Sequence, residues 1–125
     1  MKTRQFARWA EGERLSDNAL CAAVREIDNG LIDARLGGFL LKKRVAKPGR
    51  GKRGGLRTII AHRQGTRLIF LFGFAKRDRA NLDDDEKMAL HKLADIYMAQ
   101  TDKQLSELVK KKILVEVDCN GEDTD

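Results

Sequence analysis

Residues 42–57 are the part of the chain richest in side chains that could do chemistry. They read KKRVAKPGRGKRGGLR, with eight Lys or Arg among sixteen residues, four Gly, the only Pro of the chain and no acid. A Walker-type phosphate loop would need the spacing G-x-x-x-x-G-K-S/T, which residues 49–55 do not have. So dense a group of cations favours a polyanionic ligand.

The charge of the whole chain is segregated in the same way. Residues 34–77 carry 13 Lys or Arg and no Asp or Glu, whereas the other 81 residues carry 12 Lys or Arg and 19 Asp or Glu. Solubility alone would intersperse the two signs, so this segregation favours a nucleic-acid-binding face. The alternative is a solvated basic surface that an acidic partner neutralises.

Alternation along the strand predicted over residues 39–46 places Lys42 and Arg44 on one face and puts Lys43 on the apolar face. Arg57 opens the next predicted strand, and Arg77 follows the end of the third. The start of one antiparallel strand lies beside the end of the next, so we expect Arg57 and Arg77 to approach each other.

A cluster of cations without a carboxylate or an imidazole suits the cleavage of RNA by its own 2′-hydroxyl. The nucleophile is then part of the substrate, and the protein has to align it, stabilise the phosphate and transfer two protons. Arginines can clamp the phosphate, and a lysine beside other cations loses its proton more easily and can act as base or acid. Residue types alone favour phosphate-backbone binding over catalysis.

No metal site is expected. His62 and His91 have no metal-ligand spacing with each other or with Cys21 and Cys119, and the acids at 83–86 suit the start of a helix. The distant cysteines predict reduced thiols in a cytoplasmic protein, and no apolar segment predicts a signal peptide or a membrane span.

The pattern of the remaining chain predicts one α+β domain over residues 1–125, with a frayed acidic tail at 118–125. Helices are predicted over residues 16–29, 86–99 and from 101 to about 111, and residues 6–10 fit either a strand or a helical turn. Strands over 39–46, 56–63 and 66–75 predict a three-strand antiparallel meander with a loop at 48–55 and an edge strand at 113–117. We expect the helices to pack on one face of this small sheet and to leave Lys42 and Arg44 exposed on the other.

Two segments, LGGFLLKKRVAKPGRGKRGGLRTIIA (36–61) and FLFGFAKRDRANLDDDE (70–86), resemble the RelE toxin superfamily, in particular its HigB-like branch. The resemblance extends over nearly the whole chain. It implies the toxin of a type II toxin–antitoxin system, a ribosome-dependent endoribonuclease that cuts mRNA by 2′-hydroxyl attack without a cofactor. It also implies a cognate antitoxin of the helix-turn-helix type, contact with the ribosome and mRNA, and contact with operator DNA only through the antitoxin complex.

The same resemblance implies roles for individual residues. The residues expected to be catalytic are Lys42, Arg44, Arg57 and Arg77. Charge and position, and not the resemblance, give the residues expected to bind RNA: Lys43, Lys47, Arg50, Lys52, Arg53, Lys76, Arg79 and Asn81. The tyrosine that follows the last basic motif in well-known members is replaced here by ANLDDD (80–85), so Lys42 is the hypothesised base or acid. A ParE-like gyrase inhibitor and a non-catalytic nucleic-acid-binding module are the alternatives.

Overall fold

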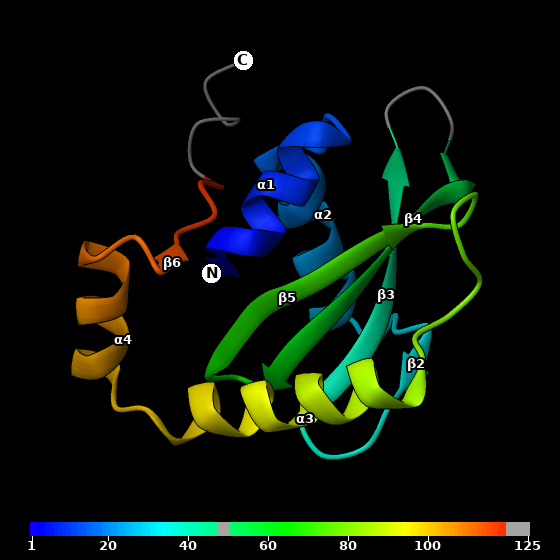
Figure 1. Ribbon diagram of the computed structural model, residues 1–125. Helices are drawn as coiled ribbons and strands as arrows, with labels where there is room; N and C mark the ends of the chain where they lie inside the picture. Colours follow the sequence, from blue (N-terminus) through cyan, green and yellow to red (C-terminus); the bar gives the residue numbers. More distant parts are fainter. Residues whose placement is uncertain (48–50, 120–125) are drawn as a thin grey trace.

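The computed structural model describes residues 1–47 and 51–119, and its central feature is a sheet with the strand order β2-β3-β4-β5-β1-β6 (Figure 1). Three long strands make up most of the sheet: β3 (Leu40–Lys47), β4 (Gly51–Arg63) and β5 (Arg67–Ala75). The short ones are β1 (Lys2–Thr3), β2 (Ala34–Arg35) and β6 (Leu114–Val115).

The predicted meander is confirmed, because β4 pairs antiparallel with both β3 and β5. Gly65, which has a φ of 76°, allows the tight turn between β4 and β5. β4 begins at Gly51, so the β3–β4 ladder extends into the segment predicted as a loop. The predicted edge strand is also present as β6, which pairs with β1, and β1 lies parallel to β5.

Side-chain caps define where the helices begin. Ser16 accepts the N–H of Ala19 at the start of α2 (Asp17–Asp28), and Asp83 forms a capping box with Glu86 at the start of α3 (Asp84–Ala99). A second capping box starts α4 (Asp102–Lys110). The three predicted helices are therefore confirmed. The ambiguous segment at 6–10 is helical and belongs to α1 (Arg4–Gly12).

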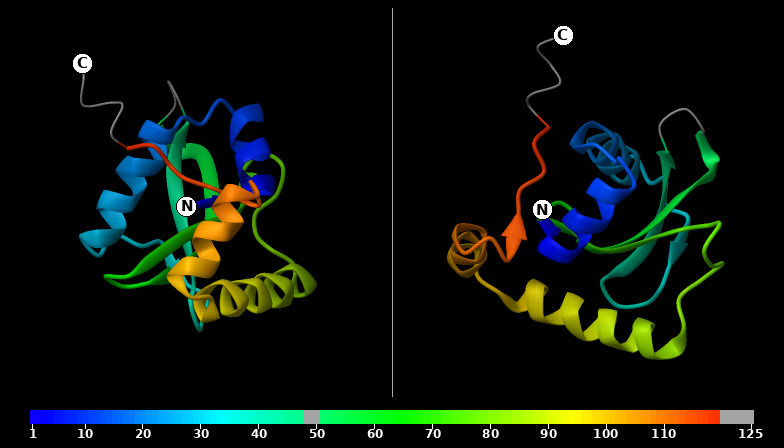
Figure 2. Two further views of the ribbon diagram at one scale, coloured as in Figure 1. Left: turned by 90° about the vertical axis from the view of Figure 1, so that its left-hand side faces the viewer. Right: turned by 45° about the horizontal axis from the view of Figure 1, so that its top comes forward.

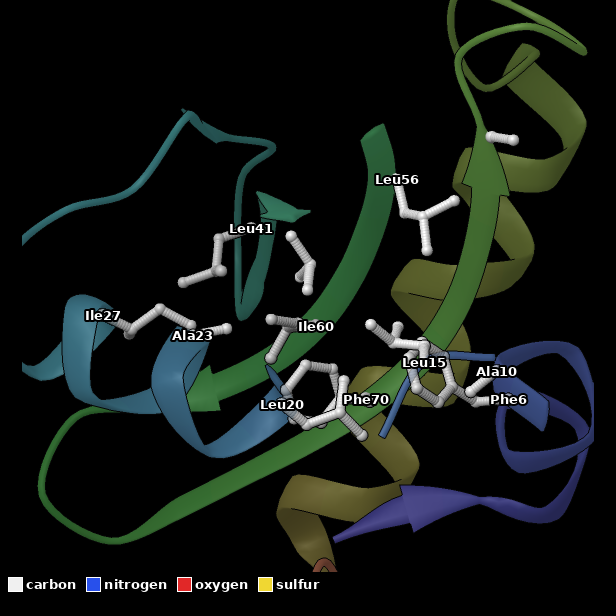
Figure 3. Close-up of a cluster of buried hydrophobic side chains, with 12 residues drawn as sticks. Phe6, Ala10, Leu15, Leu20, Ala23, Ile27, Leu41, Leu56, Ile60 and Phe70 are labelled. Atoms are coloured by element: carbon white, nitrogen blue, oxygen red, sulfur yellow. The ribbon is translucent and has the colours of Figure 1, made fainter. Parts of the chain in front are cut away.

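Helices cover both faces of the sheet, which differs from the predicted packing on one face (Figure 1, Figure 2). Leu41, Ile60 and Phe70 form a core with α1 and α2 on one face, as Figure 3 shows. Leu40 and Ile59, on the opposite face because side chains alternate, pack in a second core with α3. β5, and β4 at residues 59–61, are apolar on both faces and thus require a cover on each side.

The second face is covered only in part. α3 contacts the sheet at the level of Leu40 and Ile59, and the chain then continues into α4 and β6 beside the N-terminus (Figure 1). Two residues further along β3 and β4, the same face carries polar side chains instead of an apolar core. We call this part, defined by Lys42, Arg44 and Arg57, the cationic face.

Cys21 and Cys119 form a disulfide, so the prediction of reduced thiols is wrong. Their Cα atoms lie 5.7 Å apart although 98 positions separate them in the sequence. The segment after β6 returns to α2, where the backbone N–H of Asp118 donates to Asp17 at 2.9 Å. The spacing of the two cysteines does not predict this return, because it depends on the direction that the chain takes through α4 and β6. In the part of the chain that the structure describes, no helix has the length and apolarity needed to cross a membrane.

Candidate functional site

Arg44 and Arg57 face each other directly across the β3–β4 ladder, and Phe74 of β5 is the next residue in this row. Directly opposed residues share a face, with Cβ atoms about 4.5–5.5 Å apart. Lys42 belongs to the neighbouring row of the same face, with Ile59 and Phe72, about 7 Å along the strand. The structure therefore brings three of the four predicted catalytic cations together.

Within the part of the chain that the structure describes, two of these three cations have no protein partner. Lys42 and Arg57 are both half-buried, and no hydrogen bond or ion pair links either side chain to another residue within 1–47 or 51–119. Nη1 of Arg57 is fully shielded from solvent and is also without a hydrogen-bond acceptor. A guanidinium held in this way lacks the oxygen ligands that it needs, and an anion such as a phosphate could supply them.

Arg44 is the exposed member of the group and is held from one side by Asp33. Its Nε donates to Asp33 Oδ1 at 2.8 Å, and its backbone N–H donates to Oδ2 of the same carboxylate. Partial burial alone would raise the pKa of Asp33, but the hydrogen bonds and charge of Arg44 outweigh burial and lower it. Asp33 uses Nε, and none of the described residues forms a hydrogen bond with the terminal nitrogens of Arg44, so both can take a ligand.

Arg77, the fourth predicted catalytic residue, is oriented by α1. Its Nη2 donates to both carboxylate oxygens of Glu13, at 3.2 and 3.3 Å, and its side chain remains 58% exposed. Sequence reasoning missed Glu13, since 64 positions separate the two residues. Arg77 follows Ala75, which pairs with Leu56, so it lies at the same end of the meander as Arg57.

Arg79 connects the end of β5 to the start of α3. It forms two hydrogen bonds with Glu86, at 2.6 and 2.7 Å, and its guanidinium lies 5.3 Å from the ring centres of both Phe72 and Phe74. The hydrogen bonds to Glu86 raise the pKa of Arg79, and the same bonds lower the pKa of Glu86. This predicted RNA-binding residue is thus a fixed, planar cation beside the cationic face.

Lys43 does not belong to the cationic face, and its assignment as an RNA-binding residue needs correction. It lies on the α2 side of the sheet, is only 3% exposed and forms an ion pair with Glu26 at 2.7 Å. The alternation that placed Lys42 and Arg44 outside placed Lys43 inside, as the sequence pattern predicted. Its charge therefore neutralises a helix residue across the core.

The other predicted RNA-binding residues are less defined. Lys76 is exposed after the end of β5, and Asn81 is exposed with its side-chain oxygen accepting the N–H of Leu82. Arg50 and the side chains of Lys47, Lys52 and Arg53 lie outside the described part of the structure, so their role stays a prediction. The described residues contain no group of three or more side chains that could hold a metal ion.

Within the described residues, the open sheet face of this small α+β domain carries two cations without a protein partner, an arrangement that suits a phosphate backbone. The comparison with known families is more specific. Residues 1–117 match the family model described as the RelE toxin of the RelE / RelB toxin–antitoxin system, and the chain belongs to this family. The predicted superfamily is thereby confirmed, and the HigB-like branch stays a prediction. Among curated proteins, none matches the chain.

Proposed function

We propose that this toxin is an endoribonuclease that cleaves mRNA on the ribosome by attack of the 2′-hydroxyl on the adjacent phosphate. The observation that carries the proposal is the opposed pair of Arg44 and Arg57, with its buried, unpartnered Nη1. Like charges placed opposite each other destabilise a sheet, and a bound phosphate would convert this cost into binding energy.

In the proposed reaction the 2′-oxygen forms a bond to phosphorus and the bond from phosphorus to the 5′-oxygen breaks. The products are a 2′,3′-cyclic phosphate and a 5′-hydroxyl, so one proton leaves the nucleophile and one reaches the leaving group. Arg44 and Arg57 hold the non-bridging oxygens, whose negative charge grows in the transition state. Lys42, about 7 Å along β3 from Arg44, transfers a proton, and Arg77 binds the phosphate chain at the end of the meander.

The family implies a cognate antitoxin as partner. We propose that this antitoxin carries a helix-turn-helix domain, that the complex contacts operator DNA through it, and that the toxin works in the cytoplasm. The match of residues 1–117 to a toxin–antitoxin family supports the existence of an antitoxin, and its helix-turn-helix type follows only from the resemblance to the HigB-like branch. The ribosome and mRNA are the proposed targets because the unpaired cations suit RNA phosphates.

The test adds the purified toxin to a translating extract and maps the mRNA ends. We expect new ends with 2′,3′-cyclic phosphate only when ribosomes are translating. Arg57→Ala should lower the cleavage rate about 10²–10³-fold and Lys42→Ala about 10²–10⁴-fold, as removal of a charge-stabilising donor and of a proton-transfer group do. Arg63→Ala, at the other end of β4, is the matched control and should stay active.

Intact mRNA in this extract would refute the proposal. If the protein instead inhibits supercoiling by gyrase, the ParE-like alternative replaces it. If Arg57→Ala weakens RNA association but no cut is found with the parent protein, the cationic face belongs to a binding module.

A further inference from the structure

A small pocket lies at the seam between α1, which covers the other face of the sheet, and β5, whose Phe72 shares the face of Lys42. Its volume is about 230 Å³, and its lining consists of Gln5, Phe6, Trp9, Leu71, Phe72 and Gly73. The pocket depends on Gly73, because a Cβ atom there would lie 2.2 Å from the ring of Trp9. Trp9 can therefore lie directly on the β5 backbone and form one wall.

The lining has the chemistry of a site for one flat ring. Trp9 and Phe72 supply aromatic surface, and Gln5 is the only polar side chain. An amide both donates and accepts hydrogen bonds, as the edges of nucleobases do. At about 230 Å³ the pocket is smaller than the ~300–1,000 Å³ typical of sites for drug-sized molecules, which limits the ligand to a single small group.

Phe72 connects this pocket to the cationic face. Phe72 on β5 pairs with Ile59 on β4, which pairs with Lys42 on β3. At normal strand spacing, the backbones of Phe72 and Lys42 are therefore roughly 10 Å apart. Arg79 lies 5.3 Å from the centre of the Phe72 ring, so a fixed cation contacts one of the aromatic side chains that line the pocket. A strand of RNA crossing from Lys42 to the pocket would meet charge along its phosphates and aromatic surface at its end.

We propose that this pocket binds one unstacked nucleobase of single-stranded RNA whose phosphates lie on the cationic face. The inference rests on the proposed function and adds to it a site for a base near the cleaved phosphate. Gln5 contacts the edge of the base, and Trp9 and Phe72 contact its faces or rim. The pocket would thereby contribute to the choice of cleavage position.

Trp9 is the only tryptophan of the chain, so its fluorescence reports on this pocket directly. The probe is a short 2′-O-methyl RNA, which cannot be cleaved by 2′-attack, and the comparison is an abasic strand of the same length. Fluorescence anisotropy of a labelled strand measures binding to the protein in parallel. We expect both strands to bind and only the strand with bases to change the emission of Trp9.

Gln5→Ala removes the polar contact from an exposed position, and Gln64→Ala in the β4–β5 turn is the matched control. Because Gln5→Ala loses one hydrogen bond, the apparent Kd obtained from the Trp9 emission should rise about tenfold. Gln64→Ala should behave as the parent protein. In the translating extract, Gln5→Ala should also shift the distribution of cleavage positions.

The proposal is overturned if the RNA binds and Trp9 does not respond, if the abasic strand gives an equal response, or if the RNA does not bind. It is also overturned if Trp9 responds only to the antitoxin, since the pocket would then take an apolar side chain of that protein. A response of Trp9 to bases without mRNA cleavage would refute the nuclease and keep the pocket. Cleavage at unchanged positions by Gln5→Ala would refute the pocket and keep the nuclease.

Discussion

Arg44 and Arg57 are direct cross-strand neighbours, and within the described residues Arg44 pairs with the carboxylate of Asp33 whereas Arg57 pairs with none. Opposed like charges cost a sheet about 0.2–1 kcal/mol, and an unpaired buried nitrogen adds to that cost. A protein that did not need an anion at this place would gain stability by losing one of the two charges. A substitution at this place could therefore raise the stability of the fold, and such a loss of stability is common at sites that bind a ligand.

Arg57→Met should separate stability from function. The substitution keeps an unbranched apolar stem but removes the opposed charge and the unpartnered nitrogen, so the free energy of unfolding should stay equal or rise by up to about 1 kcal/mol. Urea unfolding measures this, and mRNA cleavage by the same sample should be lost. A drop in stability of more than 1 kcal/mol would mean that Arg57 supports the fold.

Gly73→Ala should destabilise the contact between α1 and β5. The new Cβ would lie 2.2 Å from the Trp9 ring, so α1 has to move, at a cost of about 1–3 kcal/mol. Thermal unfolding followed by Trp9 fluorescence measures the loss. Gly12→Ala is the control, because nothing lies within 4 Å of its Cβ position and alanine favours the helix; it should be neutral or stabilising.

The ion pair between Asp33 and Arg44 should make the free energy of unfolding depend on pH in the acidic range. The pKa of Asp33 in the folded protein lies below its ordinary value of 3.8, so the ion pair stabilises the fold above that value. The stabilisation is lost as the pH falls from 3.8 through the lowered pKa. Asp33→Asn should cost about 0.5–1 kcal/mol at pH 7, and its unfolding curve should merge with that of the parent in acid. Asp95→Asn, on the exposed side of α3, is the matched control and should keep the stability of the parent protein at pH 7.

Removal of the disulfide should lower stability more than any of these changes. The bond closes a loop of nearly the whole described chain, and native disulfides of this kind stabilise by about 2–4 kcal/mol. Unfolding midpoints in urea with and without reductant measure the effect. A Cys21→Ala/Cys119→Ser double variant should match the reduced parent and should not respond to reductant. Identical midpoints for oxidised and reduced parent would contradict the expectation.

Local rules predicted the elements that contain their own start signal. Ser16, Asp83 and Thr101 mark helix starts through contacts within one turn, and alternation alone separated Lys42 and Arg44 from Lys43. These features need no knowledge of distant residues. The structure accordingly has Lys42, Arg44 and Arg57 on one face of β3 and β4.

Contacts between distant segments were beyond the sequence. The pair Arg77–Glu13, which spans 64 positions, brings a carboxylate to the site, although residues 34–77 contain none. Placement of α3 on the second face, and return of the segment at Cys119 to α2, depend on how whole elements pack. Neither arrangement produces a periodic or compositional signal in the amino-acid sequence.

The bond between Cys21 and Cys119 makes a covalent ring of everything between them, including the three long strands and the basic segment at 42–57. A protease that cuts once within this ring opens the backbone but leaves a single molecule. Trypsin has many sites there, since seven Lys or Arg that are not followed by Pro fall between positions 42 and 57. A nicked toxin would run as one band on a gel without reductant and as two bands with it, and its two pieces would stay paired along the sheet.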